Sequence, residues 1–340
     1  LGDVYKRQGR GFQISYEGNV GFEQMYKHLE MLNAAEYVAT AKALGIYCNN
    51  GGFNTDNYKV ITRTGMVNNH YLAFSGGTPQ SNYRASFGVM DHNTIIKKMD
   101  YNVFVAKVDV TQKAFNDRLT GEFGVFGSSF KNHDIFDTQM LFYSAACQNP
   151  TFPAGTDEHG NWLKNESATH VNPPGILLEE KNDSKDLNFD AHIKLSYDFN
   201  KNWHVSTFGS YLYGSTENGQ FCPTWVWAQG NVYRGEFKKE EWLGNVALDF
   251  NKKFGIHKVS AGVSSEYRKL RKTAFWVYAK GIPTNDFHYD NLGATAARPY
   301  GGTESTYEDQ SLASVMGSIT YNLLDRYTLA VNARGDGSSM

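Results

Sequence analysis

Apolar and polar residues alternate along much of this chain, in runs of roughly ten residues that are each followed by a turn. The clearest run is residues 187–198, in which every second side chain is apolar. Successive side chains of a β-strand point to opposite faces, so one face of this strand suits hydrocarbon and the other suits water. The two sets are Leu187, Phe189, Ala191, Ile193, Leu195 and Tyr197, and Asn188, Asp190, His192, Lys194, Ser196 and Asp198.

The length of these runs favours a membrane. A tilted strand needs ~9–11 residues to cross a bilayer, whereas strands average ~5–6 residues in soluble proteins. Long strands that are apolar outside and polar inside are typical of a transmembrane antiparallel β-barrel. About eleven strands are predicted on this pattern, at residues 11–22, 69–75, 81–90, 101–113, 118–126, 187–198, 203–213, 241–250, 258–268, 312–323 and 327–336.

The connections between these strands alternate between short and long. Outer-membrane barrels have short periplasmic turns and long extracellular loops, whereas a soluble sandwich has no physical reason to separate its loops by length. Short turns are predicted at 76–80, 114–117, 199–202, 251–257 and 324–326, and longer connections at 46–68, 91–100, 127–186, 214–235 and 269–309, with residues 273–280 as a candidate strand extension.

Helices are predicted within or beside two of the connections. Residues 33–44 are rich in alanine, and Asn33 with Glu36 three residues later predicts a capping box at the helix start. Gly45 is a typical helix end. A second helix is predicted at 135–146.

Composition agrees with a strand-rich membrane protein. Of the 340 residues, 41% are hydrophobic and 14% aromatic, and the mean hydropathy of −0.50 is compatible with alternation. No run approaches the ~18 consecutive apolar residues of a spanning helix. The net charge of −2 provides no broad basic surface for nucleic acid.

No reactive group of residues stands out. Cys48, Cys147 and Cys222 form no CxxC pair, and the histidines lack the spacing of metal ligands. No convincing pair of carboxylates suggests glycoside hydrolysis. We therefore expect no enzyme activity, no catalytic residues, and no bound metal or cofactor.

Two groups of aromatic residues in the predicted long connections are candidate substrate contacts. Sugar rings stack their C–H faces on aromatic planes, with polar neighbours binding the hydroxyl groups. An interfacial belt explains Trp and Tyr equally well. The first group is Phe221, Trp225 and Trp227, and the second is Phe275, Trp276 and Tyr278.

Short motifs, taken in their order along the chain, resemble the SusC/RagA family of TonB-dependent outer-membrane transporters. The first lies just after the family's first barrel strand, the next two form its first periplasmic hairpin, and the last two form a mid-barrel hairpin. Thr94-Ile95-Ile96 departs from the family's usual Gly-Ile-Ile. The motifs are MLNAAEY at 31–37, FSGGT at 74–78, NYRAS at 82–86, LDRY at 324–327 and RGDGSS at 334–339.

The resemblance covers about residues 9–340 and implies a barrel of 22 strands around a plug, of which this chain would be a fragment. Residues 1–8 contain DVYKRQ, which looks like a translated sequencing adapter, and are excluded. Residues 9–10 would end the plug, and residues 11–340 would form the N-terminal half of the barrel. The absence of a signal peptide with an apolar core also favours a fragment.

The resemblance further implies active import of glycans, peptides or other large nutrients across the outer membrane of a Gram-negative bacterium. The expected partners are a SusD-like surface lipoprotein, the TonB–ExbB–ExbD complex acting through the plug, the substrate, and the lipid bilayer. Two alternatives remain from the residues alone. One is a passive porin or adhesin barrel, and the other is a soluble secreted β-sandwich that binds carbohydrate.

Overall fold

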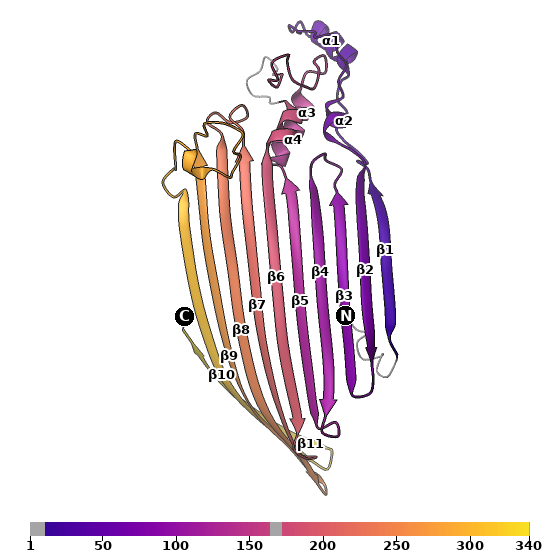
Figure 1. The fold of residues 1–340 in the computed structure, drawn as a ribbon, viewed down its shortest axis with the longest axis vertical. Helices are drawn as coiled ribbons and strands as arrows, with labels where there is room; N and C mark the ends of the chain where they lie inside the picture. The colour runs from indigo at the N-terminus through magenta and orange to yellow at the C-terminus, as the bar shows by residue number, and fades with distance from the viewer. Residues whose placement is uncertain (1–10, 164–171, 340) are drawn as a thin grey trace.

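The computed structural model describes residues 11–163 and 172–339, so the predicted adapter remnant and plug end lie outside the described residues. Eleven strands form one antiparallel sheet in sequence order (Figure 1), which confirms the predicted all-β class and strand number. The strands are β1 (Gln13–Glu23), β2 (Gly65–Gly77), β3 (Ser81–Asn93), β4 (Asp100–Ala114), β5 (Leu119–Asp134), β6 (Lys181–Asp198), β7 (Trp203–Cys222), β8 (Asn231–Phe254), β9 (His257–Lys280), β10 (Thr303–Leu323) and β11 (Tyr327–Ser338).

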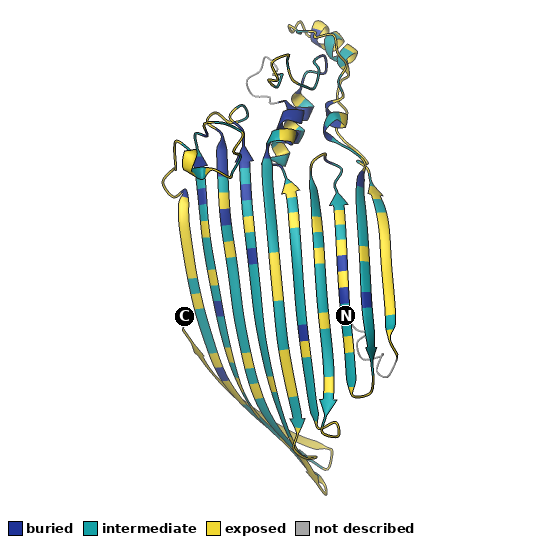
Figure 2. Cartoon of the chain, in the orientation of Figure 1, coloured by how far each residue is buried: buried dark blue, intermediate teal, exposed yellow. Residues whose placement is uncertain are grey.

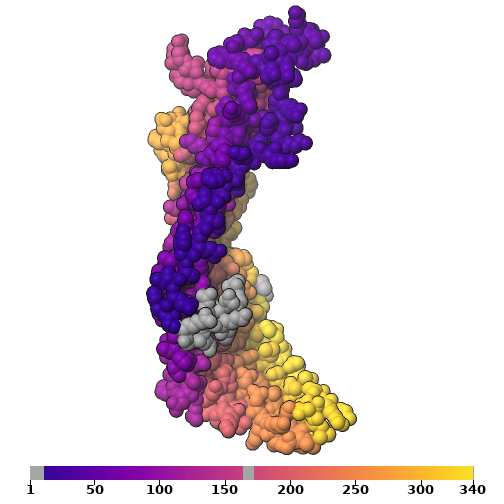
Figure 3. Space-filling view, turned by 90° about the vertical axis from the view of Figure 1, so that its right-hand side faces the viewer, coloured from indigo at the N-terminus to yellow at the C-terminus, as the bar shows by residue number. Residues whose placement is uncertain are grey.

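The sheet is bowed, and its apolar rows lie on the convex face. Figure 3 shows the bow from the side, with the segment after β9 on its convex side. His288 of that segment contacts Phe221, which places Phe221 on this face. Strand alternation then assigns the odd-numbered residues of β7 and their register partners to the same face. Val246 is one of these partners and is 54% exposed.

The apolar rows on the convex face together form a band, here called the apolar band. This band runs obliquely across the rows of register partners that join neighbouring strands. A single row of register partners joins Ile14 of β1 to Trp242 of β8 through the intervening strands. Ile14 lies near the lower limit of the band on β1, whereas Trp242 lies at its upper limit on β8. A band that stays level in a bilayer crosses the rows in this way when the strands are tilted, as they are in barrels.

Short turns lie at one end of the sheet and most of the longer connections at the other (Figure 1). The turns at 199–202 and 324–326 are as predicted. Leu324 and Asp325 both have φ of +58°, the left-handed conformation that suits a tight hairpin. The predicted turn at 251–257 is too long, because β8 and β9 continue to Phe254 and from His257.

The strands extend much further toward the loop end than the sequence pattern predicts. β8 and β9 have 24 residues each, about twice the ~9–11 needed to span a bilayer. The predicted connection at 214–235 is therefore mostly wrong, and the one at 269–309 is wrong at its two ends, since residues 214–222, 231–235, 269–280 and 303–309 belong to strands. Beyond the apolar band both faces of a strand meet water, so alternation no longer marks the strand.

Helices occupy the loop end. α1 (Ala34–Ala43) confirms the helix predicted after Asn33, and the capping box with Glu36 is formed. α3 (Thr138–Cys147) lies close to the second predicted helix. α2 (Asn57–Ile61) and α4 (Pro173–Glu179) lie where only loop was predicted. A short 3₁₀ turn, η2 (Leu292–Ala294), follows β9. No helix among the described residues is long and apolar enough to cross a membrane.

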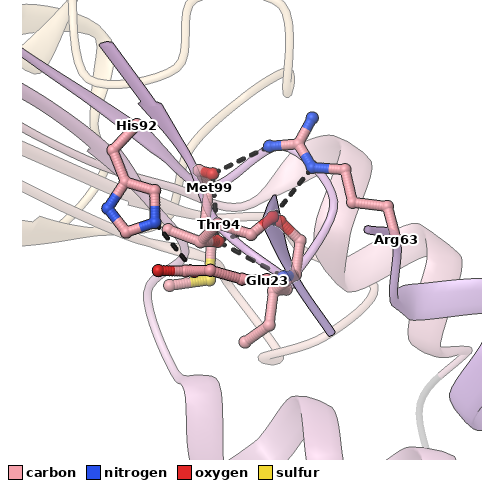
Figure 4. A network of polar contacts seen from close by, with 6 residues as sticks. Glu23, Arg63, His92, Thr94 and Met99 are labelled. Atoms are coloured by element: carbon pink, nitrogen blue, oxygen red, sulfur yellow. Dashed lines mark hydrogen bonds and ion pairs between the residues drawn. The ribbon is translucent and has the colours of Figure 1, made fainter. Parts of the chain in front are cut away.

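Burial is concentrated at the loop end (Figure 2), where two apolar clusters form. The larger cluster joins α2, α3 and α4 to the connection between β3 and β4. A polar clamp holds that connection (Figure 4), because Arg63 donates from Nε to Thr94 O at 2.9 Å and from Nη2 to Met99 O at 3.0 Å. The cluster comprises Tyr58, Ile61, Ile96, Ile135, Leu141, Ala145, Ile176 and Leu177.

Candidate functional site

The concave face of the sheet is a polar wall with paired charges. Lys194 Nζ lies 3.6 Å from Glu122 Oε1 across β5 and β6. On β8 and β9, the carboxylate of Glu241 forms ion pairs with Arg268 Nε at 2.7 Å and with Lys239 Nζ at 3.1 Å. Partly exposed pairs of this kind contribute about 0–1 kcal/mol each. These pairs therefore contribute little stability. Their main effect is a hydrophilic surface that suits an aqueous lumen.

A hollow of about 670 Å³ interrupts this wall between β6 and β10. Its aromatic side is formed by Phe237 and Trp276, whose ring centroids lie 6.1 Å apart with an interplanar angle of 16°. Lys272 Nζ reaches both carboxylate oxygens of Glu308 at 3.3 Å at its polar side. The hollow combines a flat apolar platform with charged donors and acceptors, the two features that a binding site for polar solutes requires.

The second aromatic group is not a loop cluster. Phe275, Trp276 and Tyr278 all belong to β9, which confirms the candidate strand extension at 273–280 and not a place in a connection. Trp276 and Tyr278 lie on the concave face, and Tyr278 donates its hydroxyl to Asn231 Oδ1 at 3.0 Å. Phe275 lies on the convex face and is 52% exposed. The three residues therefore do not form one cluster on one face, and their contact with substrate stays a prediction.

The first aromatic group is divided by burial. Phe221 lies in β7 rather than in a connection, and it is fully buried beneath His288. Trp225 lies in the connection between β7 and β8 and donates Nε1–H to Glu179 Oε2 at 2.6 Å. Trp227 is 46% exposed in the same connection. Only Trp225 and Trp227 occupy the predicted kind of position, and their contact with substrate stays a prediction.

The segment between β9 and β10 covers the convex side of the wall where the strands project beyond the apolar band. Ile282 packs with Phe221, Val232 and Ala279 in the smaller apolar cluster. Tyr289 donates its hydroxyl to Asp183 Oδ2 on β6 at 2.5 Å. The rim of the wall is thereby thickened on the side away from the lumen.

Backbone pairing joins the connection between β1 and β2 to the connection between β5 and β6. Phe53 N donates to Thr151 O at 3.0 Å, and Thr55 N donates to Pro150 O at 2.8 Å. Asn149 Nδ2 donates to a backbone carbonyl in the first connection at 3.1 Å. Two segments far apart in the sequence therefore form one assembly over the loop end of the wall.

Two neighbouring glutamates anchor α4 within this assembly. The carboxylate of Glu179 accepts hydrogen bonds from the indole N–H groups of Trp162 and Trp225, whose rings lie 6.1 Å apart. Glu180 is only 4% exposed and accepts from Asp137 N at 3.2 Å and from Cys222 Sγ at 3.6 Å. Burial raises the pKa of Glu180 to about 7, despite these hydrogen bonds.

This raised pKa predicts that the loop assembly loosens as pH rises. Below pH 4.5 the carboxyl of Glu180 is protonated in both the folded and the unfolded state, so burial carries no charge penalty. As pH rises through 7, the folded state must hold a buried carboxylate, and this stability is lost. The loss amounts to roughly 3 kcal/mol. Amide hydrogen exchange in α3 and α4, corrected for the intrinsic rate, should therefore quicken between pH 5 and pH 8.

Glu180→Gln should flatten this dependence. Glu158→Gln, at an exposed position, should leave it intact, and equal slopes for both variants would contradict the prediction.

Sequence reasoning missed several residues that organise these sites. Phe237 lies inside the charged run EFKKEE at 236–241, where its neighbours conceal an aromatic residue that faces the lumen. Phe237 lies two residues before Lys239 and four before Glu241, so strand alternation places all three side chains on one face. This spacing is the sequence signal that could have identified Phe237. Trp162 and Glu179 meet only through tertiary packing. Among the described residues, no three His, Cys, Asp or Glu side chains come together as a metal site.

Sequence comparisons with known proteins find TonB-dependent receptors. No protein-family model matches the chain. The TonB-dependent receptor SusC of Bacteroides thetaiotaomicron is 26% identical over 98% of this chain and 35% of its own length. The TonB-dependent receptor P3 of Formosa agariphila is also 26% identical, over 99% of this chain and 35% of its own length. The chain is thus similar in sequence to TonB-dependent receptors over nearly its whole length. It spans about a third of the length of these curated relatives.

Solved structures of the RagAB peptide importer show the same fold. The RagAB peptide importer in its open-open state aligns with a TM-score of 0.74 at 13% identity, over 98% of this chain and 42% of that chain. The closed-closed state of the same importer gives a TM-score of 0.73 at 12% identity, over 98% and 43%. The open sheet thus has the fold of part of these importer chains, and the predicted partial-barrel fold is confirmed. The named relatives are receptors and importers rather than enzymes.

Proposed function

We propose that this chain forms lumen wall and extracellular loops of an outer-membrane importer that takes up glycans or other large nutrients. The observation that carries the proposal is the opposition of the two faces of one sheet. The convex face presents apolar rows, including Val246 and Val263, whereas the concave face presents ion pairs. Lipid outside and water inside account for both faces.

We further propose that the whole receptor works with partners outside this chain. By the family relationship, TonB, ExbB and ExbD would supply energy through a plug, and a SusD-like lipoprotein would sit over the loop end. The long strand extensions and the joined loop assembly support this orientation, because they place ordered protein well beyond the apolar band. The location would be the outer membrane of a Gram-negative bacterium.

The soluble alternative conflicts with the packing. A β-sandwich buries the apolar face of one sheet against a second sheet. The described strands form one sheet only, and the apolar side chains on its convex face are exposed. A passive barrel differs from the proposed importer in its energy requirement, which experiment can measure.

Growth and uptake experiments test the proposed function. We expect deletion of the gene that encodes the complete receptor to abolish growth on one complex nutrient, and complementation to restore growth only when TonB is present. Uptake of a labelled fraction of that nutrient should fall to background in a TonB-deficient strain. Uptake that continues at the same rate without TonB would support a passive barrel instead.

A further inference from the structure

We infer that a groove on the lipid-facing side of the wall binds one anionic phospholipid, with an acyl chain in the groove and the headgroup phosphate at the turn end of β8. The groove lies on the convex face of β7 to β11, near the turns (Figure 1). Its volume is about 520 Å³, within the ~300–1,000 Å³ typical of sites for small molecules. The inference goes beyond the proposed import function, although both assign lipid to the convex face.

The floor of the groove is formed by small residues on adjacent strands. Ala261 of β9, Gly317 of β10 and Ala333 of β11 all line it. Gly317 is the register partner of Val263 on β9 and of Ala333 on β11, so the floor crosses three strands. A Cβ atom built on Gly317 meets no atom within 4 Å beyond its chain neighbours. The space above this glycine is therefore open.

Large apolar side chains form the walls on either side of this floor. The register places Ala261 between Phe250 of β8 and Ile319 of β10. Trp203 extends the first wall, because its ring centroid lies 4.7 Å from that of Phe250. Val331 extends the second wall, where it and Ile319 are 59% and 58% exposed. An acyl chain would contact both walls and the floor, and such dispersion contacts are large in sum although each is weak.

A polar ledge borders the groove on the side of the turns. Tyr321 lies two residues after Ile319 on β10, so strand alternation directs it to the same face. Its hydroxyl is joined to His257 Nδ1 by a hydrogen bond of 2.6 Å. Lys252 lies two residues after Phe250 on β8 and also points to the convex face. Tyrosine and lysine at the end of an apolar band are typical of a membrane interface.

Charge on the ledge favours an anionic headgroup. Lys252 is exposed and has no ion-pair partner among the described residues. The acids nearest to it are directed elsewhere, since Asp325 pairs with Lys258 and Asp249 points to the concave face. A lysine ammonium donates to phosphate oxygens and attracts anionic lipids. In the proposed orientation the short turns lie on the periplasmic side, so the phospholipid belongs to the periplasmic leaflet.

Native mass spectrometry of the complete receptor in detergent tests this inference. The receptor is titrated with phosphatidylglycerol and, separately, with phosphatidylcholine that carries the same acyl chains. We expect one saturable phosphatidylglycerol adduct, which phosphatidylcholine matches only at higher concentration. Lys252→Gln should weaken phosphatidylglycerol binding by about fivefold, because one cation–phosphate contact is lost. Gly317→Leu should abolish the saturable adduct with either lipid, because its side chain fills the open space of the groove.

Matched controls lie on the same strands. Gly244→Leu adds the same side chain to the convex face of β8, at another glycine whose Cβ position is open and which does not line the groove. Lys253→Gln removes the neighbouring charge, which points to the concave face. Both variants should bind phospholipid as wild type does. A heat-dependent shift in gel mobility shows that each variant is folded, and if Gly317→Leu fails to fold, Lys252→Gln decides.

Three results would overturn the inference. The first is a wild-type receptor with no saturable adduct, including one that forms dimers through this face without bound lipid. The second is equal binding by folded Gly317→Leu and Gly244→Leu. The third is a preference for phosphatidylglycerol that Lys252→Gln leaves intact. Failure of the proposed function would appear separately, as uptake that does not depend on TonB while phospholipid binding is normal.

Discussion

Replacing Val246 by arginine should strongly destabilise the membrane-inserted barrel. Val246 lies midway along the apolar band of β8, between Trp242 and Phe250, on the convex face. A charged side chain near the bilayer midplane of a β-barrel costs about 2–4 kcal/mol. This is a large fraction of the ~5–15 kcal/mol that stabilises a typical folded protein. The measurement is urea unfolding of the complete receptor in lipid vesicles, followed by its heat-dependent shift in gel mobility.

The neighbouring residue provides the control. Asn245 precedes Val246 on the same strand, so its side chain points to the concave face. Asn245→Arg adds the same charge and similar bulk to a polar, hydrated surface, and it should change the unfolding midpoint little. If both variants were destabilised equally, the assignment of lipid to the convex face would be wrong. If only Asn245→Arg were destabilised, the two faces would be reversed.

The sequence pattern predicts those strands well that lie within the apolar band. The run at 187–198 becomes the band-level part of β6, and its alternation is strong because one face meets lipid and the other meets water. The same strand begins earlier, at Lys181, where polar residues occupy both faces. Water on both sides removes the selection for alternation, so no local pattern could show where β6 begins.

The helices at the loop end show a second limit. Asn33 and Glu36 predict the start of α1 correctly, because a capping box depends only on residues close together in the sequence. The paired prolines at 173 and 174 suggest loop, yet they occupy the first positions of α4. Proline is tolerated there because the first amide groups of a helix have no partner within it. The helix itself is held by tertiary contacts, since Ile176 is fully buried in the larger apolar cluster at the loop end.

The candidate sites were less predictable than the fold, because they depend on which residues share a face or a wall. Phe275 and Trp276 are adjacent in sequence but lie on opposite faces of β9, so a cluster defined by proximity along the chain mixes lipid-side and lumen-side residues. Phe237 stacks on Trp276 because the register of β8 and β9 makes them diagonal neighbours on the same face. Asn57 meets Gln148 only when two distant connections fold together.

This chain expressed alone, without the rest of the barrel, should fail to form a stable membrane-inserted fold. β1 and β11 are the two edges of the sheet, and every residue of β11 is exposed. Within hydrocarbon, each unpaired backbone N–H or C=O group costs several kcal/mol. Two open edges present many such groups, and their summed cost exceeds the ~5–15 kcal/mol that stabilises a typical folded protein.

Refolding of the isolated chain and of the complete receptor, under identical detergent and lipid conditions, measures this effect. We expect the complete receptor to give a compact, protease-resistant species with a heat-dependent mobility shift. The isolated chain should give protease-sensitive material or β-rich aggregates, because open strand edges pair with one another. A monomeric, protease-resistant form of the isolated chain in vesicles would show that the sheet satisfies its edges by itself. It would then be wrong to describe this chain as one part of a closed barrel wall.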